Sequence, residues 1–224
     1  FVVLLFSIVV ILISGERMPF LQLIFGIFIF TLFSLKFSKK IILFFITCVF
    51  LIISIFIISP SAFDRYKDTF NGINSLYNDI KEEKNLESQI ISKHGVYDYY
   101  QNFNSAIILW KKNYLFGNGY RYYKNNCNNE LETSAIWGCS THPHNIYLEI
   151  LSDYGLIGLS IYLIFLYKLL VNFLKSDNKK YYGIFLTILV TSVPFVTSPS
   201  IFSSHYGSIY FFYFFLLRYY TVLK

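Results

Sequence analysis

Six runs of apolar residues constrain this chain more than any other feature of its sequence. They occupy residues 1–13, 18–35, 41–59, 146–174, 181–198 and 201–217. A helix that spans a bilayer needs about 20 mostly apolar residues. The 224 residues are 55% hydrophobic, 21% aromatic and only 14% charged, whereas soluble domains average about 25% charged residues. We therefore expect an all-α integral membrane protein, a polytopic transmembrane helix bundle with about six spans.

The first apolar run begins at Phe1 and is neither preceded by a basic segment nor followed by a cleavage site. We interpret residues 1–13 as the end of a spanning helix rather than as a signal peptide. On this interpretation the chain is the C-terminal part of a larger bundle.

Basic side chains gather at one end of the predicted spans, and the positive-inside rule assigns that end to the cytoplasm. One short connection supplies Lys36, Lys39 and Lys40, and another supplies Lys175, Lys179 and Lys180. The tail supplies Arg218 and Lys224. The chain then divides into spans at 1–59, an extracytoplasmic loop domain at 60–144, and spans with a cytoplasmic tail at 145–224. The net charge of +6 comes mostly from the cytoplasmic side, and no basic module with interleaved aromatic residues indicates a nucleic-acid partner.

The long extracytoplasmic loop contains short helical patterns. Residues 60–93 are polar, and we expect a short helix followed by a mobile stretch. Within residues 97–114, apolar residues at three- and four-residue spacing predict an amphipathic helix that lies on the membrane or on the bundle. They are Tyr100, Phe103, Ile107, Trp110 and Tyr114. The run Gly117-Asn118-Gly119 then predicts a turn whose backbone can approach a ligand closely.

Two of the three cysteines, Cys127 and Cys139, lie in this loop, while Cys48 lies in a predicted span. A pair of cysteines in an oxidising compartment predicts a disulfide. For a loop of this size the entropy model gives about 3 kcal/mol of stabilisation. Two unpaired thiols are the alternative.

His142 and His144 stand at the border between the polar loop and the long apolar run. Imidazole is the side chain best suited to moving protons near neutral pH, and Asn145 is a good N-cap for the helix that follows. Hydrogen-bonding histidines without a catalytic role are one alternative. A zinc site is another, with Glu149, His94 or Cys139 as third ligand, but no familiar ligand spacing supports it and we expect no metal.

Charged residues near the predicted exterior surface supply further candidates. Glu16 and Arg17 lie between two apolar runs, where they form an interfacial ion pair or present a guanidinium to a phosphate. Arg121 follows the glycine turn, and Arg65 is by default a solvated surface residue. Glu149 and Asp153 share a helix face and favour the positive N-terminal end of that helix. Gly155 and Gly158 allow close helix packing in lipid.

Three runs of residues together resemble the O-antigen ligase and polymerase superfamily. They are Ser14-Gly15-Glu16-Arg17, Phe116-Gly117-Asn118-Gly119-Tyr120-Arg121 and the stretch 139–158. The last is the most specific, because an H-N-x-Y-L-x-x-L-x-x-x-G-x-x-G pattern after a large exterior loop is typical of the family. The arrangement of Arg121, Cys127 and residues 139–144 is similar to that of alphaproteobacterial members.

This resemblance implies a glycosyltransferase of the bacterial inner membrane with a periplasmic active face. Such enzymes move a saccharide from undecaprenyl diphosphate to lipid A-core or to another saccharide, without metal, nucleotide or other cofactor. Carried onto this chain, His144, Arg17 and Arg121 are the predicted catalytic residues. Many relatives have an arginine ahead of the tryptophan-containing helix, but residues 100–104 of this chain contain none. Whether Arg121 or Arg65 takes the role of the second arginine therefore stays open. The predicted substrate-binding residues are His142, Glu16, Asn145, Arg65 and Tyr120.

A transporter or flippase for lipid-linked saccharides is the alternative in another functional class. Such a protein is expected to place charged side chains along a cavity inside its spans. Here the predicted spans hold few charges, and the polar groups gather at one face. The pattern therefore favours catalysis at the exterior face over transport.

Overall fold

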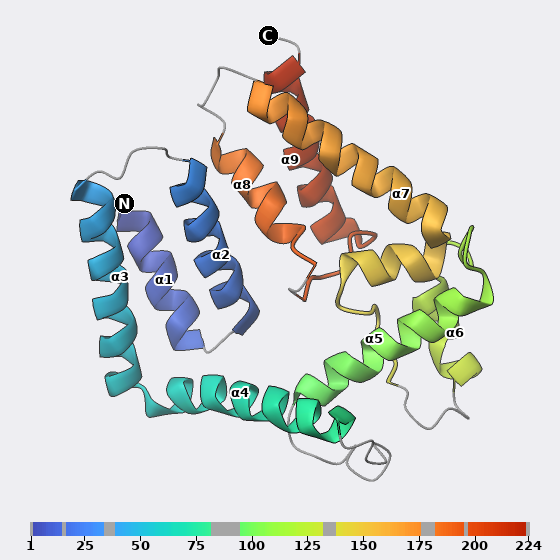
Figure 1. Ribbon diagram of the computed structural model, residues 1–224, viewed down its shortest axis with the longest axis horizontal. Helices are drawn as coiled ribbons and strands as arrows, with labels where there is room; N and C mark the ends of the chain where they lie inside the picture. Colours follow the sequence, from blue (N-terminus) through green and yellow to red (C-terminus); the bar gives the residue numbers. More distant parts are fainter. Residues whose placement is uncertain are drawn as a thin grey trace. The chain divides into compact units, whose positions relative to one another are not determined.

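The computed structural model describes residues 2–14, 17–33, 39–81, 95–131, 138–175, 182–194 and 197–222. Every regular element in these ranges is a helix, which confirms the prediction of an all-α chain (Figure 1). The chain forms two compact units, Phe1–Asn78 and Asp79–Lys224. The boundary falls inside the predicted extracytoplasmic loop, and the division at 59 and 144 stays a prediction because it concerns sides of a membrane.

The first unit is built from three apolar helices and one amphipathic helix. They are α1 (Val2–Ser14), α2 (Arg17–Phe33), α3 (Lys39–Ile58) and α4 (Pro60–Lys81). Ile8 and Leu12 of α1 pack against Cys48 and Ile55 of α3. The helix α4 is longer than the short helix expected at 60–93, and the stretch expected to be mobile lies mostly outside the described residues.

The second unit contains the other five helices. They are α5 (Gly95–Lys112), α6 (Tyr122–Leu131), α7 (Ile146–Lys175), α8 (Tyr182–Thr191) and α9 (Ser204–Val222). The helices α5, α6 and α7 enclose a core that includes Leu109, Tyr123 and Leu131, and Phe173 of α7 stacks on Phe185 of α8. These helices carry the candidate site.

Helix lengths support the predicted spans only in part. Of the described helices, Ile146–Lys175 is long and apolar enough to cross a bilayer, and a second candidate arises if Ile46–Ile58 and Phe63–Lys81, which meet at 98°, are counted together. The bundle of about six spans therefore stays a prediction. The run 181–198 differs from its expected form, because α8 ends at Thr191 and the described residues between α8 and α9 are irregular. Pro194 lacks the N–H that a longer helix would need.

The face of α5 that is buried within the chain differs from its apolar face. Tyr100, Phe103, Ile107 and Trp110 are half-buried and Tyr114 is exposed. The residues that pack inward are mostly polar or small: Tyr97, Gln101, Asn102, Ser105, Ala106 and Leu109. Hydrogen bonds to the loop and to α6 satisfy these polar groups, such as Tyr123 Oη to Asn102 Oδ1 at 3.0 Å and Gly138 N to Ser105 Oγ at 3.2 Å. The apolar spacing gives no sign of this polar contact face, and the predicted position of the apolar face on the membrane or on the bundle stays a prediction.

Gly155 breaks α7 instead of packing it against another helix in lipid. Its φ is 65°, in the left-handed region, and a Cβ there would lie 2.5 Å from the backbone nitrogen of Gly117. Gly117 has φ 71° and faces Asp153 equally closely, with 2.5 Å between a Cβ and the Asp153 carbonyl oxygen. Only residues without side chains allow both backbones to approach in this way.

The break exposes backbone groups of α7 that the loop 114–119 then satisfies. Four backbone hydrogen bonds join the two segments: Asn118 N to Ser152 O (3.2 Å), Gly119 N to Asp153 O (2.8 Å), Leu156 N to Tyr114 O (2.9 Å) and Ile157 N to Leu115 O (3.1 Å). We call this pairing of loop 114–119 with residues 152–157 the glycine interlock. It leaves residues 156–175 as a straight piece of about 30 Å at 1.5 Å per residue, the thickness of a bilayer core.

We predict that Gly155→Ala lowers the free energy of unfolding by at least about 2 kcal/mol, since a left-handed non-glycine residue costs about 1–3 kcal/mol before any clash. Thermal unfolding of the detergent-solubilised protein measures the effect. Gly183→Ala in α8 is the matched control, because nothing lies within 4 Å of a Cβ there and φ is not positive. Equal stability of the two variants would contradict the interlock.

Candidate functional site

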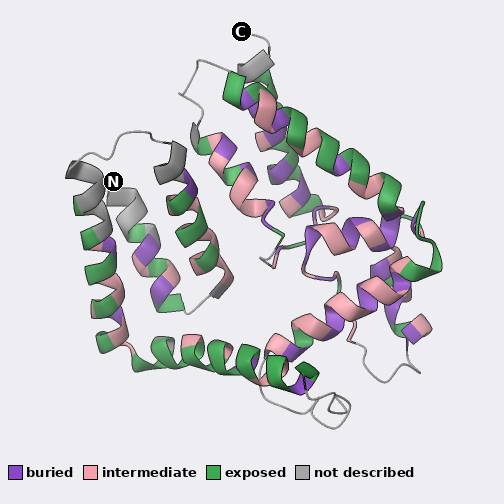
Figure 2. Cartoon of the chain, in the orientation of Figure 1, coloured by how far each residue is buried: buried purple, intermediate pink, exposed green. Residues whose placement is uncertain are grey.

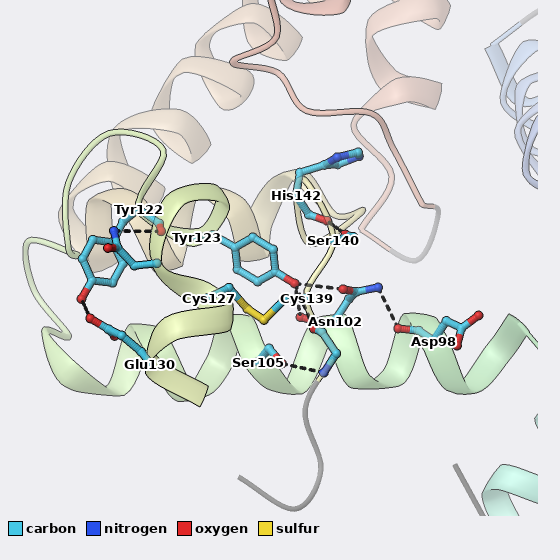
Figure 3. The surroundings of a disulfide bond; sticks show 12 residues. Asp98, Asn102, Ser105, Tyr122, Tyr123, Cys127, Glu130, Cys139, Ser140 and His142 are labelled. Atoms are coloured by element: carbon cyan, nitrogen blue, oxygen red, sulfur yellow. Dashed lines mark hydrogen bonds between the residues drawn. A yellow bond between two sulfur atoms is a disulfide. The ribbon is translucent and has the colours of Figure 1, made fainter. Parts of the chain in front are cut away.

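The segment 138–145 reaches the site along the inner face of α5. Cys139 is joined by a disulfide to Cys127 of α6, with 5.8 Å between their Cα atoms. Tyr123 donates a hydrogen bond to the carbonyl of Gly138 (3.3 Å), and Gly138 N donates to Ser105. Figure 3 shows the Tyr123 ring beside the disulfide, with its hydroxyl directed at Asn102 and with Ser140 and His142 on the same side of α5. These contacts tie the histidine segment to both α5 and α6.

His142 and His144 lie against each other, with ring centroids 4.2 Å apart. Thr141 Oγ1 is 3.0 Å from His142 Nδ1, while His142 Nε2 is buried and has no hydrogen-bond partner among the residues that the structure describes. His144 has φ 56° and its ring meets Tyr99 edge-on at 5.4 Å. Its carbonyl accepts a hydrogen bond from Ser198 N (2.8 Å), so the strained backbone of His144 binds the irregular segment after α8.

Burial keeps both imidazoles neutral near pH 7. Burial and the neighbouring His144 lower the pKa of His142 to about 4. Burial also lowers the pKa of His144 below its ordinary value of 6.5. A neutral imidazole can accept a proton, which is the form that a general base requires.

Asn145 caps α7 as the sequence indicated. Its Oδ1 accepts hydrogen bonds from Tyr147 N (3.0 Å) and Leu148 N (3.1 Å), and its Nδ2 donates to the carbonyl of Pro194 (2.8 Å). The residue is buried. It therefore acts in the structure as a helix cap that also holds the segment after α8.

Arg121 is held at the start of α6 by the glycine interlock and by an acidic residue of α7. Its φ is 55°, and it follows Gly119, whose φ is 111°. The Asp153 carboxylate accepts a hydrogen bond from Tyr123 N (3.1 Å) in the first turn of α6. The Arg121 guanidinium donates to the carbonyl of Phe202 (2.8 Å) and lies 5.1 Å from the centroid of the Tyr120 ring.

Glu149 is a buried carboxylate that organises the segment before α9. It is 6% exposed. Ser200 Oγ donates to one of its oxygens, and Ile201 N donates to the other at 3.2 Å. Because Arg121 binds the next residue, Phe202, the guanidinium and this carboxylate hold the same turn of chain.

A pocket of about 340 Å³ lies where these groups meet. Its walls combine basic, acidic, imidazole and hydroxyl side chains: Arg121, Tyr123, Lys124, Thr141, His142, Glu149, Asp153, Pro199, Ser200 and Ser203. His142 therefore lines the pocket, and the ring of His144 lies against the ring of His142. The sequence predicts the larger role for His144.

The remaining predicted site residues are Tyr120, Arg17, Glu16 and Arg65. Tyr120 is exposed beside Arg121. Arg17 begins α2 in the first unit, but its side chain, like all of Glu16, lies outside the described residues. Arg65 is exposed and donates a hydrogen bond to the carbonyl of Ser14 (2.8 Å), the last residue of α1. The predicted meeting of Arg17 with Arg121 and His144 stays a prediction.

No group of three histidine, cysteine, aspartate or glutamate side chains in the described ranges could hold a metal ion. Of the third ligands considered for zinc, Cys139 is in the disulfide and His94 lies outside those ranges.

Comparison with known protein families identifies the family to which this chain belongs. The family model described as O-antigen ligase matches residues 2–163, which include Arg17, Arg121 and His144. The chain belongs to the O-antigen ligase family. No curated protein and no solved structure matched the chain. Membership in the O-antigen ligase family supports a glycosyltransferase-like role in polysaccharide biosynthesis, and members are typically bacterial inner-membrane proteins.

Several residues that line the pocket of this O-antigen ligase family member were not predicted from the sequence. Ser203 lies in the predicted span 201–217 and Ser200 directly before it, and both lie beyond the family match. The sequence placed Glu149 and Asp153 at the positive end of the helix, with Glu149 also weighed as a zinc ligand, and did not indicate that both are buried. Two carboxylates one turn apart in an otherwise apolar run were the available signal, since such groups are buried only when they have partners.

We predict that only Cys48 reacts with a thiol reagent when the denatured, unreduced protein is labelled, because the disulfide blocks Cys127 and Cys139. Mass spectrometry should show one label without reductant and three labels after reduction. Three labels without reductant would remove the disulfide from the native protein.

Proposed function

We propose that this protein moves a saccharide from an undecaprenyl diphosphate carrier to an acceptor sugar, as an O-antigen ligase or polymerase. The observation that carries the proposal is the pocket in which Arg121 and His142 lie together, with His144 against His142. Membership in the O-antigen ligase family supports it. The acceptor is lipid A-core for a ligase and another carrier-linked saccharide for a polymerase.

The proposed reaction needs a base and an anion site. An acceptor hydroxyl attacks the anomeric carbon of the donor sugar, and its proton passes to His144. A glycosidic bond forms as the bond between that carbon and the diphosphate oxygen breaks, and undecaprenyl diphosphate leaves with the electron pair. A positioned general base contributes about 10²–10⁴-fold to the rate of such a step.

Arg121 suits the leaving diphosphate. A guanidinium carries five N–H donors in a planar fork that matches phosphate oxygens, and the contact with Phe202 fixes its orientation. The Glu149 carboxylate receives two hydrogen bonds from the segment 200–201, so its own partners satisfy it. Donors fixed before the reaction stabilise developing negative charge most effectively. We assign Arg17 to the same diphosphate, with Tyr120 and His142 as substrate contacts.

The proposed setting is a multi-pass protein of the bacterial inner membrane with a periplasmic active face. The basic residues at one end of the predicted spans support this orientation. Beyond the first turns of the run 146–174, the predicted spans carry almost no charge apart from Lys168. A flippase needs a polar path through its spans, so this pattern favours the transferase. We expect the reaction to need no metal or nucleotide.

We predict that His144→Ala lowers transfer at least about 100-fold, since the base is lost, and that His142→Ala lowers it less. The measurement is the surface polysaccharide profile of cells that lack the gene and receive each variant, with membrane insertion verified. Restoration of capped lipid A-core by the wild type indicates a ligase, and extension of single repeat units indicates a polymerase. His205→Ala, an exposed histidine of α9, is the control.

The pH dependence of initial rates gives a second readout of the same assignment. His144 acts when neutral, and its pKa lies below 6.5. Activity should therefore be flat from about pH 7.5 to 8 and fall to half of this plateau only below pH 6.5, as the imidazole takes up a proton. Near-complete activity in both alanine variants, or a steep loss already below pH 7.5, would contradict the assignment.

A further inference from the structure

The helix α4 has one apolar face along its whole length. Phe63, Tyr66, Phe70, Ile73 and Tyr77 recur at three- and four-residue spacing, so they share a face. The rest of the helix is largely polar, with acidic and basic residues in equal number: Asp64, Asp68, Asp79, Arg65, Lys67 and Lys81. This pattern is typical of a helix that lies at a boundary between water and an apolar phase.

Most of this face is exposed in the described part of the first unit. Phe70 and Tyr77 are each 65% exposed, and Ile73 is 52% exposed. Figure 2 shows α4 exposed along most of its length. Single exposed apolar residues are ordinary, but a continuous stripe of large ones indicates a contact surface.

The direction of the face follows from the residue in the middle of it. Tyr66 packs against Phe20 of α2 (5.2 Å between ring centroids) and Phe56 of α3 (5.5 Å). Arg65 binds the C-terminal carbonyl of α1. In the first unit α4 therefore crosses the ends of the three apolar helices (Figure 1), and its apolar face is turned toward the side on which they lie.

The exposed apolar surface of α4 continues that of α3. Helix α3 presents large exposed side chains along its length: Leu43, Ile46, Val49, Phe50, Ile53, Ile57 and Ile58. Only Ser59 separates the two helices, and their axes meet at 98°. A helix that crosses a bilayer and then bends by a right angle at its end delivers the following helix into the plane of the membrane surface.

We propose that α4 lies in the exterior interface of the membrane, with the face formed by Phe63, Phe70, Ile73 and Tyr77 inserted at the boundary of headgroups and acyl chains. This inference rests on the proposed crossing of the membrane by α3. Because the charges of α4 balance, apolar burial rather than attraction to anionic lipid holds the helix. The partner of this apolar face is thus a lipid surface, with anionic or with neutral headgroups. A face packed on protein is the competing arrangement.

The test uses the full chain in vesicles of neutral phosphatidylcholine, with nitroxide labels on single cysteines in a Cys48→Ala background. Phe70→Cys and Ile73→Cys place the label on the apolar face. The matched controls Asp68→Cys and Asn71→Cys place it on the polar face of the same turns. Phe50→Cys on α3 reports whether that helix crosses the bilayer. Collision with oxygen measures exposure to lipid, and collision with a nickel chelate measures exposure to water.

We expect labels at 70 and 73 to favour oxygen at least about fivefold over labels at 68 and 71, and the label at 50 to be the most lipid-exposed. Equal access of the nickel chelate at all four α4 positions would overturn the inference. Immobile labels at 70 and 73, shielded from both reagents, would show a protein contact and also overturn it. A water-exposed label at 50 would instead refute the proposed topology.

Discussion

The site depends on one close contact between two backbones. Gly117 and Gly155 both have positive φ, and a Cβ on either would collide with the other segment. Four backbone hydrogen bonds between loop 114–119 and residues 152–157 replace those that α7 loses at its break. Since buried backbone groups must find partners, the break and the loop require each other. The consequence is a rigid corner at the start of the long apolar helix.

This corner brings together groups from three segments. It places Arg121 next to the capping carboxylate of Asp153, and it turns Glu149 toward the segment before α9. In the same segment the carbonyl of Phe202 accepts a hydrogen bond from Arg121, and the backbone N–H of Ser198 donates one to the carbonyl of His144. The side chains of Arg121, Glu149 and Asp153 are thus each held by a backbone group of another segment, which is the arrangement that keeps a catalytic pocket preorganised.

Local patterns predicted most of the helices, but of the residues that line the pocket they predicted only Arg121 and His142 as site residues. Long apolar runs gave α1, α2, α3 and α9 within a few residues, and Asn145 was recognisable as a cap because capping is local. The break at Gly155 depends on a loop nearly 40 residues earlier, so no window of α7 reveals it. The polar contact face of α5 is not visible in the sequence for a related reason: polar residues there are satisfied by the loop and α6, and apolar spacing does not record such partners. The relation of Arg17 to the pocket stays a prediction.

The most direct test of the account is transfer by the purified protein. Vesicles with the protein receive an undecaprenyl-diphosphate-linked saccharide and a labelled acceptor sugar on the same side, in the presence of EDTA. The account predicts one new glycosidic product for each undecaprenyl diphosphate released, and loss of that product with His144→Ala. Movement of the intact lipid-linked saccharide across the bilayer, with no product formed on either side, would contradict it.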